Sequence, residues 1–245
     1  MNHPPIEAYD EIDSTNAEAR RRAEAGDPGP VWITAAVQTS GRGRRGRTWS
    51  TQRGNLAATL LMTTGAPPVE AAQISFVAAL AAADLADACL GPDIAQLKWP
   101  NDVLIYGRKC VGVLVESGAR ADGRLWLAVG IGVNLAHAPQ DVERPATSFA
   151  EHMSARPPEP LAALEVMAAR FEAWRRTWTT QGFAPIARTW TERALGLGQP
   201  CEARLPARTL RGVAEGLDAD GALRLRLDDG TLERITAGDV FFERS

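Results

Sequence analysis

Two β-rich segments, residues 111–116 and 125–130, constrain the fold of this chain more than any other feature. Both are dominated by Val, Leu and other residues that favour strands. Asp122-Gly123 lies between them, and this dipeptide is strongly favoured in tight hairpin turns. The two segments are therefore predicted to pair as antiparallel strands, at the centre of a larger antiparallel sheet.

Further elements give the first 196 residues a mixed α and β pattern. Residues 31–37 and 55–62 are predicted strands. Three helices are predicted: one from Ser14 to about Ala25, with Thr15 and Glu18 at capping-box spacing, one over residues 69–90, and one over residues 161–178 with apolar residues three to four positions apart. Residues 136–160 are rich in proline and predict an extended surface loop, with a short helix near residues 147–153.

The pattern changes after Gly196-Leu197-Gly198. Short β segments follow at residues 201–205, 209–217, 222–227, 231–236 and 239–242, with turns at Asp220-Gly221 and Asp229-Gly230. These segments predict a small β-barrel. The expected fold class is α+β, with a larger domain over residues 1–196 and a barrel domain over residues 197–245.

A second unusual feature is the Arg-Gly loop, residues 41–47, which reads GRGRRGR and follows a predicted strand directly. Glycines let the backbone N–H groups approach a ligand closely, and guanidinium groups offer planar pairs of donors to phosphate or carboxylate. The loop therefore predicts a binding site for an anion. Like charges and glycine entropy also predict that the empty loop is mobile and becomes ordered when an anion binds.

Two other interpretations of the Arg-Gly loop compete with binding of a small anion. Its glycines satisfy the dinucleotide pattern G-x-G-x-x-G, but that pattern needs a helix directly after it and an acidic residue about 20 positions on. A polar, turn-rich segment and the residues GAPP stand there instead. A nucleic-acid patch is the other interpretation, and the loop alone leaves it open. The net charge of −3 makes the loop a local basic feature of an acidic chain, which favours a small anionic ligand.

Cysteine usage and hydropathy bear on the compartment. Cys89, Cys110 and Cys201 are odd in number and have no C-x-x-C spacing, so neither a disulfide framework nor a zinc site is expected. The N-terminus lacks the pattern of a signal peptide, and no segment is expected to have the apolar length of a membrane span. The sequence therefore predicts a cytoplasmic protein without a membrane partner.

Two more motifs could carry chemistry. Residues 98–102, KWPND, combine a cation, an aromatic ring and two polar side chains, and Lys109 follows closely. A hairpin turn at Gly107 would bring the strands of Lys98 and Lys109 side by side; a surface hairpin with exposed lysines is the alternative. Residues 130–134, GIGVN, end a strand with two glycines and Asn134, which allows a flat ligand to approach, although a β-bulge would explain the glycines too.

These motifs, taken in order, closely resemble the bacterial biotin protein ligases. The resemblance rests on Ser14-Thr15-Asn16, Gln38, the Arg-Gly loop with Trp49, KWPND, Lys109 with Gly112, and GIGVN, and it covers nearly the whole chain. It implies a catalytic domain related to the class II aminoacyl-tRNA synthetases, with a mixed and largely antiparallel sheet, followed by a small SH3-like β-barrel.

The resemblance also implies a reaction in two steps. Biotin and ATP form biotinyl-5′-AMP and pyrophosphate, and biotin then passes to one lysine of a biotin carboxyl carrier protein, usually a subunit or domain of an acyl-CoA carboxylase. Mg²⁺ is expected to accompany ATP; no metal ligands are assigned. Dimerisation through a sheet edge is compatible with such a chain, but no sequence feature requires it.

Site residues are implied by the same resemblance. The catalytic set is Lys109, Arg42 and Lys98. The biotin-binding set is Ser14, Thr15, Asn16, Gln38, Arg42, Gly43, Arg44, Lys109 and Gly112. The set for ATP and the adenylate is Arg44, Arg47, Trp49, Asn101, Asp102, Lys109 and Asn134, with Trp49 expected to help shield the mixed anhydride from water.

The chain departs from the family pattern in places. Fewer than fifteen residues precede Ser14, so the form without an N-terminal DNA-binding domain is expected, with no DNA partner. Cys110-Val111 precedes Gly112 where a small residue often stands, and residues 51–53 replace a common Ser-Pro turn. Cys110 is interpreted as a packed strand residue and not a nucleophile, because no histidine is near it in sequence.

Two alternative functions differ from biotin ligation. A lipoate or octanoate transferase shares the fold, but its own arginine-glycine signature, with consecutive glycines and a nearby histidine, is absent. A noncatalytic nucleic-acid-binding module would need a basic face larger than the Arg-Gly loop.

Overall fold

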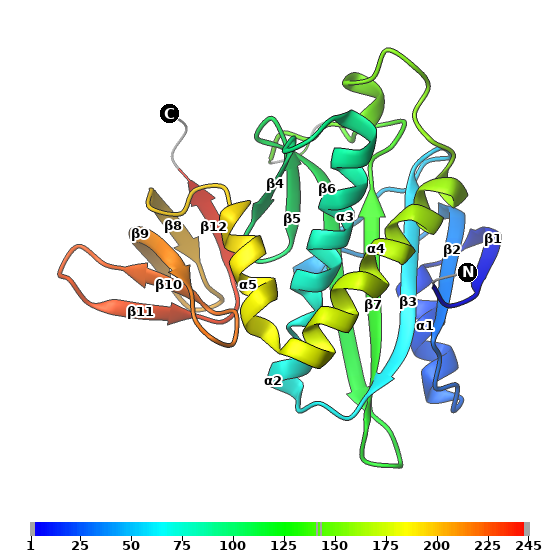
Figure 1. The fold of residues 1–245 in the computed structure, drawn as a ribbon, viewed down its shortest axis with the longest axis horizontal. Coiled ribbons are helices and arrows are strands. Elements are labelled where there is room, and N and C mark those ends of the chain that lie inside the picture. The colour runs from blue at the N-terminus through cyan, green and yellow to red at the C-terminus, as the bar shows by residue number, and fades with distance from the viewer. Residues whose placement is uncertain (1–2, 141, 143, 243–245) are drawn as a thin grey trace.

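A seven-stranded sheet forms the centre of the protein, in a computed structural model that describes residues 3–140, 142 and 144–242 (Figure 1). Its strand order is β1-β2-β3-β7-β6-β5-β4. The strands are β1 (Ile6–Ile12), β2 (Val31–Gln38), β3 (Leu56–Thr64), β4 (Ala95–Lys98), β5 (Asp102–Ile105), β6 (Arg108–Ala119) and β7 (Leu125–Val133). β1 and β2 are parallel and the other neighbours are antiparallel. The predicted mixed, largely antiparallel sheet is therefore confirmed.

The predicted hairpin is the long pair β6 and β7. Ala119 lies opposite Leu125 at the turn, and Gly112 lies opposite Gly132 near the far end. Gly123 has a φ of 80°, a backbone conformation that glycine adopts without strain. Both strands are longer than predicted, because their pairing extends from Ala119 opposite Leu125 to Val111 opposite Val133.

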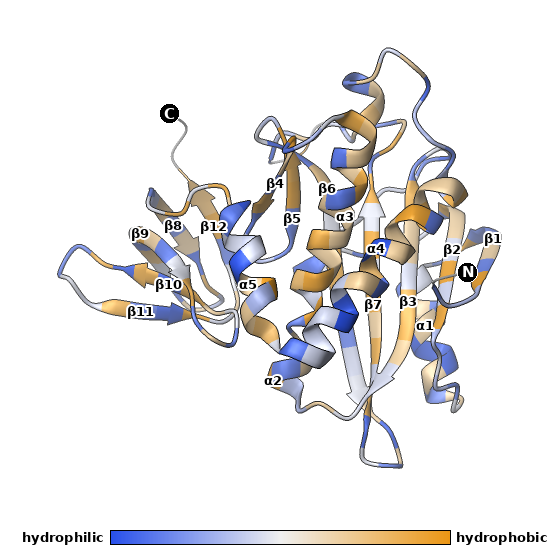
Figure 2. Ribbon diagram, viewed as in Figure 1, coloured by the Kyte–Doolittle hydropathy of each residue, from blue (hydrophilic) through white to orange (hydrophobic). Residues whose placement is uncertain are grey.

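Side chains alternate between two different faces of this sheet. On one face, residues such as Trp32, Leu60 and Val113 join the main hydrophobic core, beneath α3 (Ile74–Leu90) and α4 (Pro160–Gln181). On the other, Ile33, Leu61 and Ala128 pack in a smaller cluster with α1 (Thr15–Glu24). Figure 2 shows hydrophobic and hydrophilic residues alternating along α4, as expected of a helix with one buried side. Only part of the second face is covered, which leaves room for a site.

The helices differ from the predictions in detail. Ser14, not Thr15, caps α1, and its side chain accepts a hydrogen bond from the backbone of Ala17. The predicted helix over residues 69–90 is divided into α2 (Pro68–Ala71) and α3. The expectation about apolar length was also wrong, since residues 68–90 are long and apolar enough for a membrane span; two-thirds of the most apolar stretch is buried in the structure, as in a core helix.

Several elements were not predicted. They are β1, the short strand β5 and α5 (Phe183–Glu192), whereas β4 is the strand expected to carry Lys98. β4 and β5 correct the expected register, because β5 lies between the strand of Lys98 and the strand of Lys109. The turn at Gly107 does exist, but it joins β5 to β6. The short helix predicted near residues 147–153 is a 3-10 turn, Phe149–Glu151.

The C-terminal segment forms a second, five-stranded antiparallel sheet in the order β11-β10-β9-β8-β12. Its strands are β8 (Pro200–Arg204), β9 (Thr209–Leu217), β10 (Leu223–Arg226), β11 (Leu232–Ile235) and β12 (Asp239–Phe242), close to the predicted segments. This small SH3-like barrel packs beside α5 and β4 (Figure 1). Buried residues such as Leu223 and Val240 continue the main core, and the Trp99 indole donates a hydrogen bond to the Gly221 carbonyl at 3.0 Å. The barrel is therefore packed firmly against the larger domain.

The contact of α4 with the sheet gives a test of the core. Phe171 is fully buried and meets the Trp32 ring edge-on at a centroid distance of 5.6 Å. We expect Phe171→Ala to lower the free energy of unfolding by about 3 to 5 kcal/mol, because it removes buried area and leaves a cavity. Urea denaturation measures this. Leu161→Ala, at a half-exposed position of the same helix, is the control and should change stability by less than about 1 kcal/mol; equal losses in the two variants would contradict this description of the core.

Candidate active site

A cavity of about 500 Å³ opens on the sheet face opposite α3 and α4. It brings together the start of α1, the end of β2, the Arg-Gly loop, β6, β7 and the turn before β5. The predicted site residues that line it are Ser14, Thr15, Asn16, Gln38, Arg42, Gly43, Arg44, Arg47, Trp49, Asn101, Asp102, Lys109, Gly112 and Asn134. Lys98 is absent from the described lining residues. Residues far apart in the chain thus meet in one pocket.

One end of the pocket is a network of polar side chains, in which Thr15, Asn16, Thr51 and Thr59 are buried and Gln38 is half-buried. Gln38 Oε1 accepts hydrogen bonds from Thr15 N at 2.8 Å and Thr15 Oγ1 at 3.1 Å, while Gln38 Nε2 donates to Thr51. Thr59 Oγ1 lies 2.7 Å from Asn16 Oδ1. Because each of these groups already has a partner, their orientations are fixed before any ligand arrives.

Glycines form the floor between the two ends. Gly112 and Gly132 lie opposite each other on β6 and β7, and the Trp49 indole rests over them. A Cβ at Gly132 would stand 2.3 Å from the Trp49 ring, and one at Gly130 would stand 2.1 Å from Asn16 Oδ1. A larger residue at position 130 or 132 would therefore displace a side chain of the pocket.

Lys109 reaches the pocket because of a β-bulge. The β5 to β6 register shifts so that Val103 pairs with Val111 but Leu104 pairs with Lys109, which leaves Cys110 as an extra residue in β6. Cys110 and Val111 both join the core, and Lys109 turns toward the cavity. Burial raises the pKa of the Cys110 thiol, and its Sγ lies 3.4 Å from the Asn134 carbonyl oxygen. This matches the interpretation of Cys110 as a packed strand residue.

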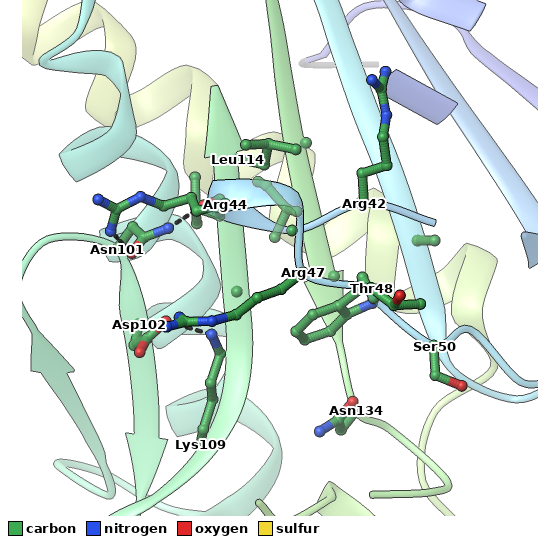
Figure 3. Close-up of a pocket in the computed structure, with 18 of the residues that line it drawn as sticks. Arg42, Arg44, Arg47, Thr48, Ser50, Asn101, Asp102, Lys109, Leu114 and Asn134 are labelled. Atoms are coloured by element: carbon green, nitrogen blue, oxygen red, sulfur yellow. Dashed lines mark hydrogen bonds and ion pairs between the residues drawn. The ribbon is translucent and has the colours of Figure 1, made fainter. Parts of the chain in front are cut away.

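The other end of the pocket is rich in cations. Lys109 Nζ lies 2.6 Å from Asp102 Oδ1, and Arg44 donates to Asn101 Oδ1 at 2.9 Å (Figure 3). Five cations line the described part of the cavity (Arg42, Arg44, Arg47, Lys109 and Arg144) against two carboxylates (Asp102 and Asp239). Such an excess of positive charge in a cleft favours a strongly anionic ligand. Burial lowers the pKa of Arg44, and the charges of Asp239 and Asp102 offset part of this effect.

The Arg-Gly loop carries most of these cations and has a defined conformation. It contains a 3-10 turn, Arg44–Gly46, in which Arg45 and Gly46 have φ values of 56° and 73°. Gly41 is tightly packed, since a Cβ there would lie 2.3 Å from the Trp49 carbonyl oxygen. Arg42 points away from Lys109 and Asp102 in Figure 3 and lies 3.6 Å from Glu116 Oε2.

Lys98 occupies a different place from the other predicted residues. It is buried, and its Nζ lies 5.6 Å from the centre of the Phe241 ring of the barrel. Burial and the charge of Arg144 lower the pKa of Lys98 to about 8, although Asp102 and Asp239 act in the opposite direction. Lys98 therefore lies behind the cation end of the pocket, where the two sheets meet.

Two residues that line the pocket, Arg144 and Asp239, were not predicted from the sequence. Arg144 belongs to the proline-rich loop and lies 3.4 Å from Asp102 Oδ2. Asp239 begins β12 and accepts a hydrogen bond from Arg47 at 2.6 Å. Nothing in the local sequence marks either one, because their partners are distant in the chain. Burial raises the pKa of Asp239, but hydrogen bonding and charge from Arg47, with the charge of Arg144, hold it below its usual value.

The acidic residues of the pocket do not form a metal cage. No group of three or more His, Cys, Asp or Glu side chains suited to a metal occurs within residues 3–140, 142 and 144–242. Asp102 is already paired with Lys109 and Arg144.

Comparison with known proteins gives a consistent result. Residues 10–134 match the Biotin/lipoate A/B protein ligase family, and residues 196–243 match the Biotin protein ligase C terminal domain. The biotin–[acetyl-CoA-carboxylase] ligase of Paracoccus denitrificans is 43% identical, with 94% of this chain and 97% of the relative aligned. The bifunctional ligase/repressor BirA of Bacillus subtilis is 32% identical, with 95% of this chain and 72% of the relative aligned.

A solved structure shares the whole fold. The biotin protein ligase from Aquifex aeolicus in complex with biotin and ATP superposes with a TM-score of 0.81 and 26% identity, covering 98% of this chain and 99% of that one. The chain therefore belongs to the biotin protein ligases, ATP-dependent enzymes that use biotin and ATP as substrates. Enzymes of this family act on biotin carboxyl carrier proteins.

The burial of Lys98 predicts a pH dependence of stability. A folded-state pKa near 8, below the unfolded value of about 10.5, means that holding the charged lysine destabilises the fold at neutral pH, and that this cost is lost as pH rises through the interval between the two values. We expect wild type to gain about 2 kcal/mol relative to Lys98→Met between pH 7 and pH 9.5. Urea unfolding of both proteins at the two pH values measures this difference; a constant difference would mean that Lys98 titrates normally.

Proposed function

We propose that the two ends of the pocket hold the two substrates, with biotin at the buried polar network and ATP at the cation-rich end. The observation that carries this proposal is the continuity of the cavity between them, which is lined by Asn16 and Gln38 at one end and by Lys109 and Arg47 at the other. A carboxylate attached to a ligand in the polar end would point toward the cations, where the α-phosphate must lie.

The polar end suits the ureido ring of biotin. That ring carries two N–H donors and one carbonyl acceptor, and Ser14, Thr15, Asn16 and Gln38 offer hydroxyl and amide groups to match them. The dithiolane ring of lipoate and the alkyl chain of octanoate have no such groups. Neither could add hydrogen bonds to these side chains, so each is expected to bind less tightly than biotin.

Lys109 is the principal catalytic cation in this proposal. In the first step, a carboxylate oxygen of biotin attacks the α-phosphorus of ATP, and the bond to pyrophosphate breaks. Two anionic groups must approach each other, so a fixed cation between them stabilises the transition state. The bulge aims Lys109 into the pocket, and its contact with Asp102 holds it there.

The Arg-Gly loop is proposed to close over both substrates. Arg44 and Arg47 already face the cation end, whereas Arg42 must turn inward from its position near Glu116 to meet the biotin carboxylate. Gly43 lets the backbone approach the ligand. Trp49 would move from its place over Gly112 and Gly132 to cover the adenylate.

The remaining predicted residues are assigned supporting roles. Asn101 and Asp102 hold Arg44 and Lys109, and Asn134 lies where the nucleotide would sit. Lys98 is proposed to act as a positioning residue, through its charge on the neighbouring groups. Mg²⁺ is expected to arrive as part of the MgATP substrate, held by phosphate oxygens and water.

In the second step, the amine of a carrier lysine attacks the carbonyl carbon of biotinyl-5′-AMP and AMP leaves. We propose that the carrier is the biotin carboxyl carrier protein of an acyl-CoA carboxylase. The carrier lysine would enter through the open side of the pocket.

The proposal extends to organisation and location. We assign residues 1–196 to the catalytic domain and residues 197–245 to the barrel domain. The free thiols of Cys89, Cys110 and Cys201 support a cytoplasmic location. The net charge of −3 supports the absence of nucleic-acid and membrane partners. β1 is an edge strand and could pair with a second copy of the chain. Analytical ultracentrifugation would show whether such a homodimer forms.

Exchange of labelled pyrophosphate into ATP tests the adenylation step. We expect exchange with biotin but not with lipoate, octanoate or no acid. Lys109→Ala and Arg42→Ala should each lower the rate by about a hundredfold or more, because each removes a donor proposed to meet the developing charge, Arg42 once the loop has closed. Folded protein that shows no exchange with any acid in the presence of Mg²⁺ would refute the proposed function; retention on DNA at low salt would then favour a binding module.

A further inference from the structure

Asp239 makes an unusual contact, because a carboxylate from the barrel enters the cation-rich end of the pocket. It is only 4% exposed and lines the cavity. Its Oδ2 accepts hydrogen bonds from Arg47 at 2.6 Å and Arg45 at 3.2 Å, and its Oδ1 lies 3.8 Å from Arg144. One carboxylate therefore faces three arginines.

Two backbone carbonyl groups next to Asp239 make further contacts with the Arg-Gly loop. Arg44 donates to the carbonyl oxygen of Gly238 at 3.1 Å, and Arg45 lies 3.4 Å from the carbonyl oxygen of Arg204, which pairs with Asp239 across β8 and β12. Arg47 and Asp239 are 192 positions apart in the chain. The sequence predicts that the Arg-Gly loop becomes ordered when an anion binds. In the structure the loop already contacts an anionic group, the Asp239 carboxylate of the barrel.

We propose that Asp239 is a positioning residue for the adenylation step: it holds the Arg-Gly loop in place and orients Arg47 toward the substrate phosphate. The kinetic part of this inference rests on the proposed function, while the effect on loop order does not. The barrel thereby contributes to a reaction whose substrates bind mainly to the larger domain.

The donor capacity of arginine makes positioning possible. A guanidinium carries five N–H donors, and Asp239 engages only Nη2 of Arg47. The other donors remain for phosphate. An arginine already held by a carboxylate loses less side-chain and loop entropy when substrate binds, so its held position strengthens substrate binding.

A competing role for Asp239 makes the opposite prediction. If the carboxylate blocked Arg47, substrate phosphate would have to displace it, and removing its charge would strengthen ATP binding. The sign of the change in the KM for ATP therefore separates positioning from competition.

The test uses Asp239→Asn, Asp239→Glu and a matched control in the full-length protein. Asp218→Asn is the control, because Asp218 pairs with Arg234 in the same barrel and has no part in the pocket. Arg45→Asn is an independent variant: Arg45 contacts Asp239 without lining the cavity, and asparagine tolerates its φ of 56°. Near-ultraviolet circular dichroism checks that each variant is folded.

The first readout is hydrogen–deuterium exchange of peptides covering residues 41–50 in the ligand-free protein. Asp239→Asn is expected to speed exchange about tenfold or more, Arg45→Asn to speed it less, and Asp218→Asn to leave it unchanged. Saturating biotin and MgATP should slow exchange in every variant. Wild-type exchange rates in ligand-free Asp239→Asn would overturn the inference.

The second readout is the kinetics of biotin-dependent pyrophosphate exchange. Asp239→Asn is expected to raise the KM for ATP about tenfold with kcat changed less than about threefold, and Asp239→Glu to restore part of the loss. A lower KM would indicate competition, and a fall in kcat alone would indicate a general defect; either result would overturn positioning. If the wild type shows no pyrophosphate exchange, the proposed function and this kinetic claim are both refuted. The hydrogen–deuterium exchange of residues 41–50 would still decide whether Asp239 orders the loop.

Discussion

One extra residue in β6 decides which side chains reach the pocket. The bulge at Cys110 places Cys110 and Val111 together in the core and turns Lys109 to the opposite face. Regular pairing would direct Lys109 into the core with Val111, since side chains alternate along a strand. The position of the principal cation, and with it the position of the substrates, therefore depends on this local irregularity in an otherwise regular sheet.

Around Lys109, the protein gathers more positive than negative charge in a partly enclosed space. Asp102 and Asp239 pair with several of these cations and fix their directions, but they do not neutralise all of them. Preorganised charge of this kind lowers the barrier of a reaction between two anions, because the cations need little rearrangement as charge develops. Glycines at 112 and 132 complete the site by leaving space for a flat ligand.

Much of this arrangement was predictable, and the failures have physical causes. The β6–β7 hairpin and the barrel strands followed from turn dipeptides and local β propensity, and the resemblance identified fourteen residues that do line the pocket. The bulge, β5 between the two lysines, and the contact of Asp239 with Arg47 were missed. Each depends on pairing between distant segments, which local patterns do not encode. The break between α2 and α3 was not predicted, because Ala72 and Gln73 are both compatible with a continuous helix.

The central claim is that Lys109 acts where the biotin carboxylate meets the α-phosphate, and titration calorimetry tests it most directly. Wild type and Lys109→Met would each be titrated with biotin and with a nonhydrolysable analogue of biotinyl-5′-AMP. The account predicts that the variant loses far more affinity for the analogue than for biotin, by about tenfold or more, because only the analogue carries the group that stands in for the α-phosphate. Equal losses for the two ligands, or no loss for the analogue, would contradict it.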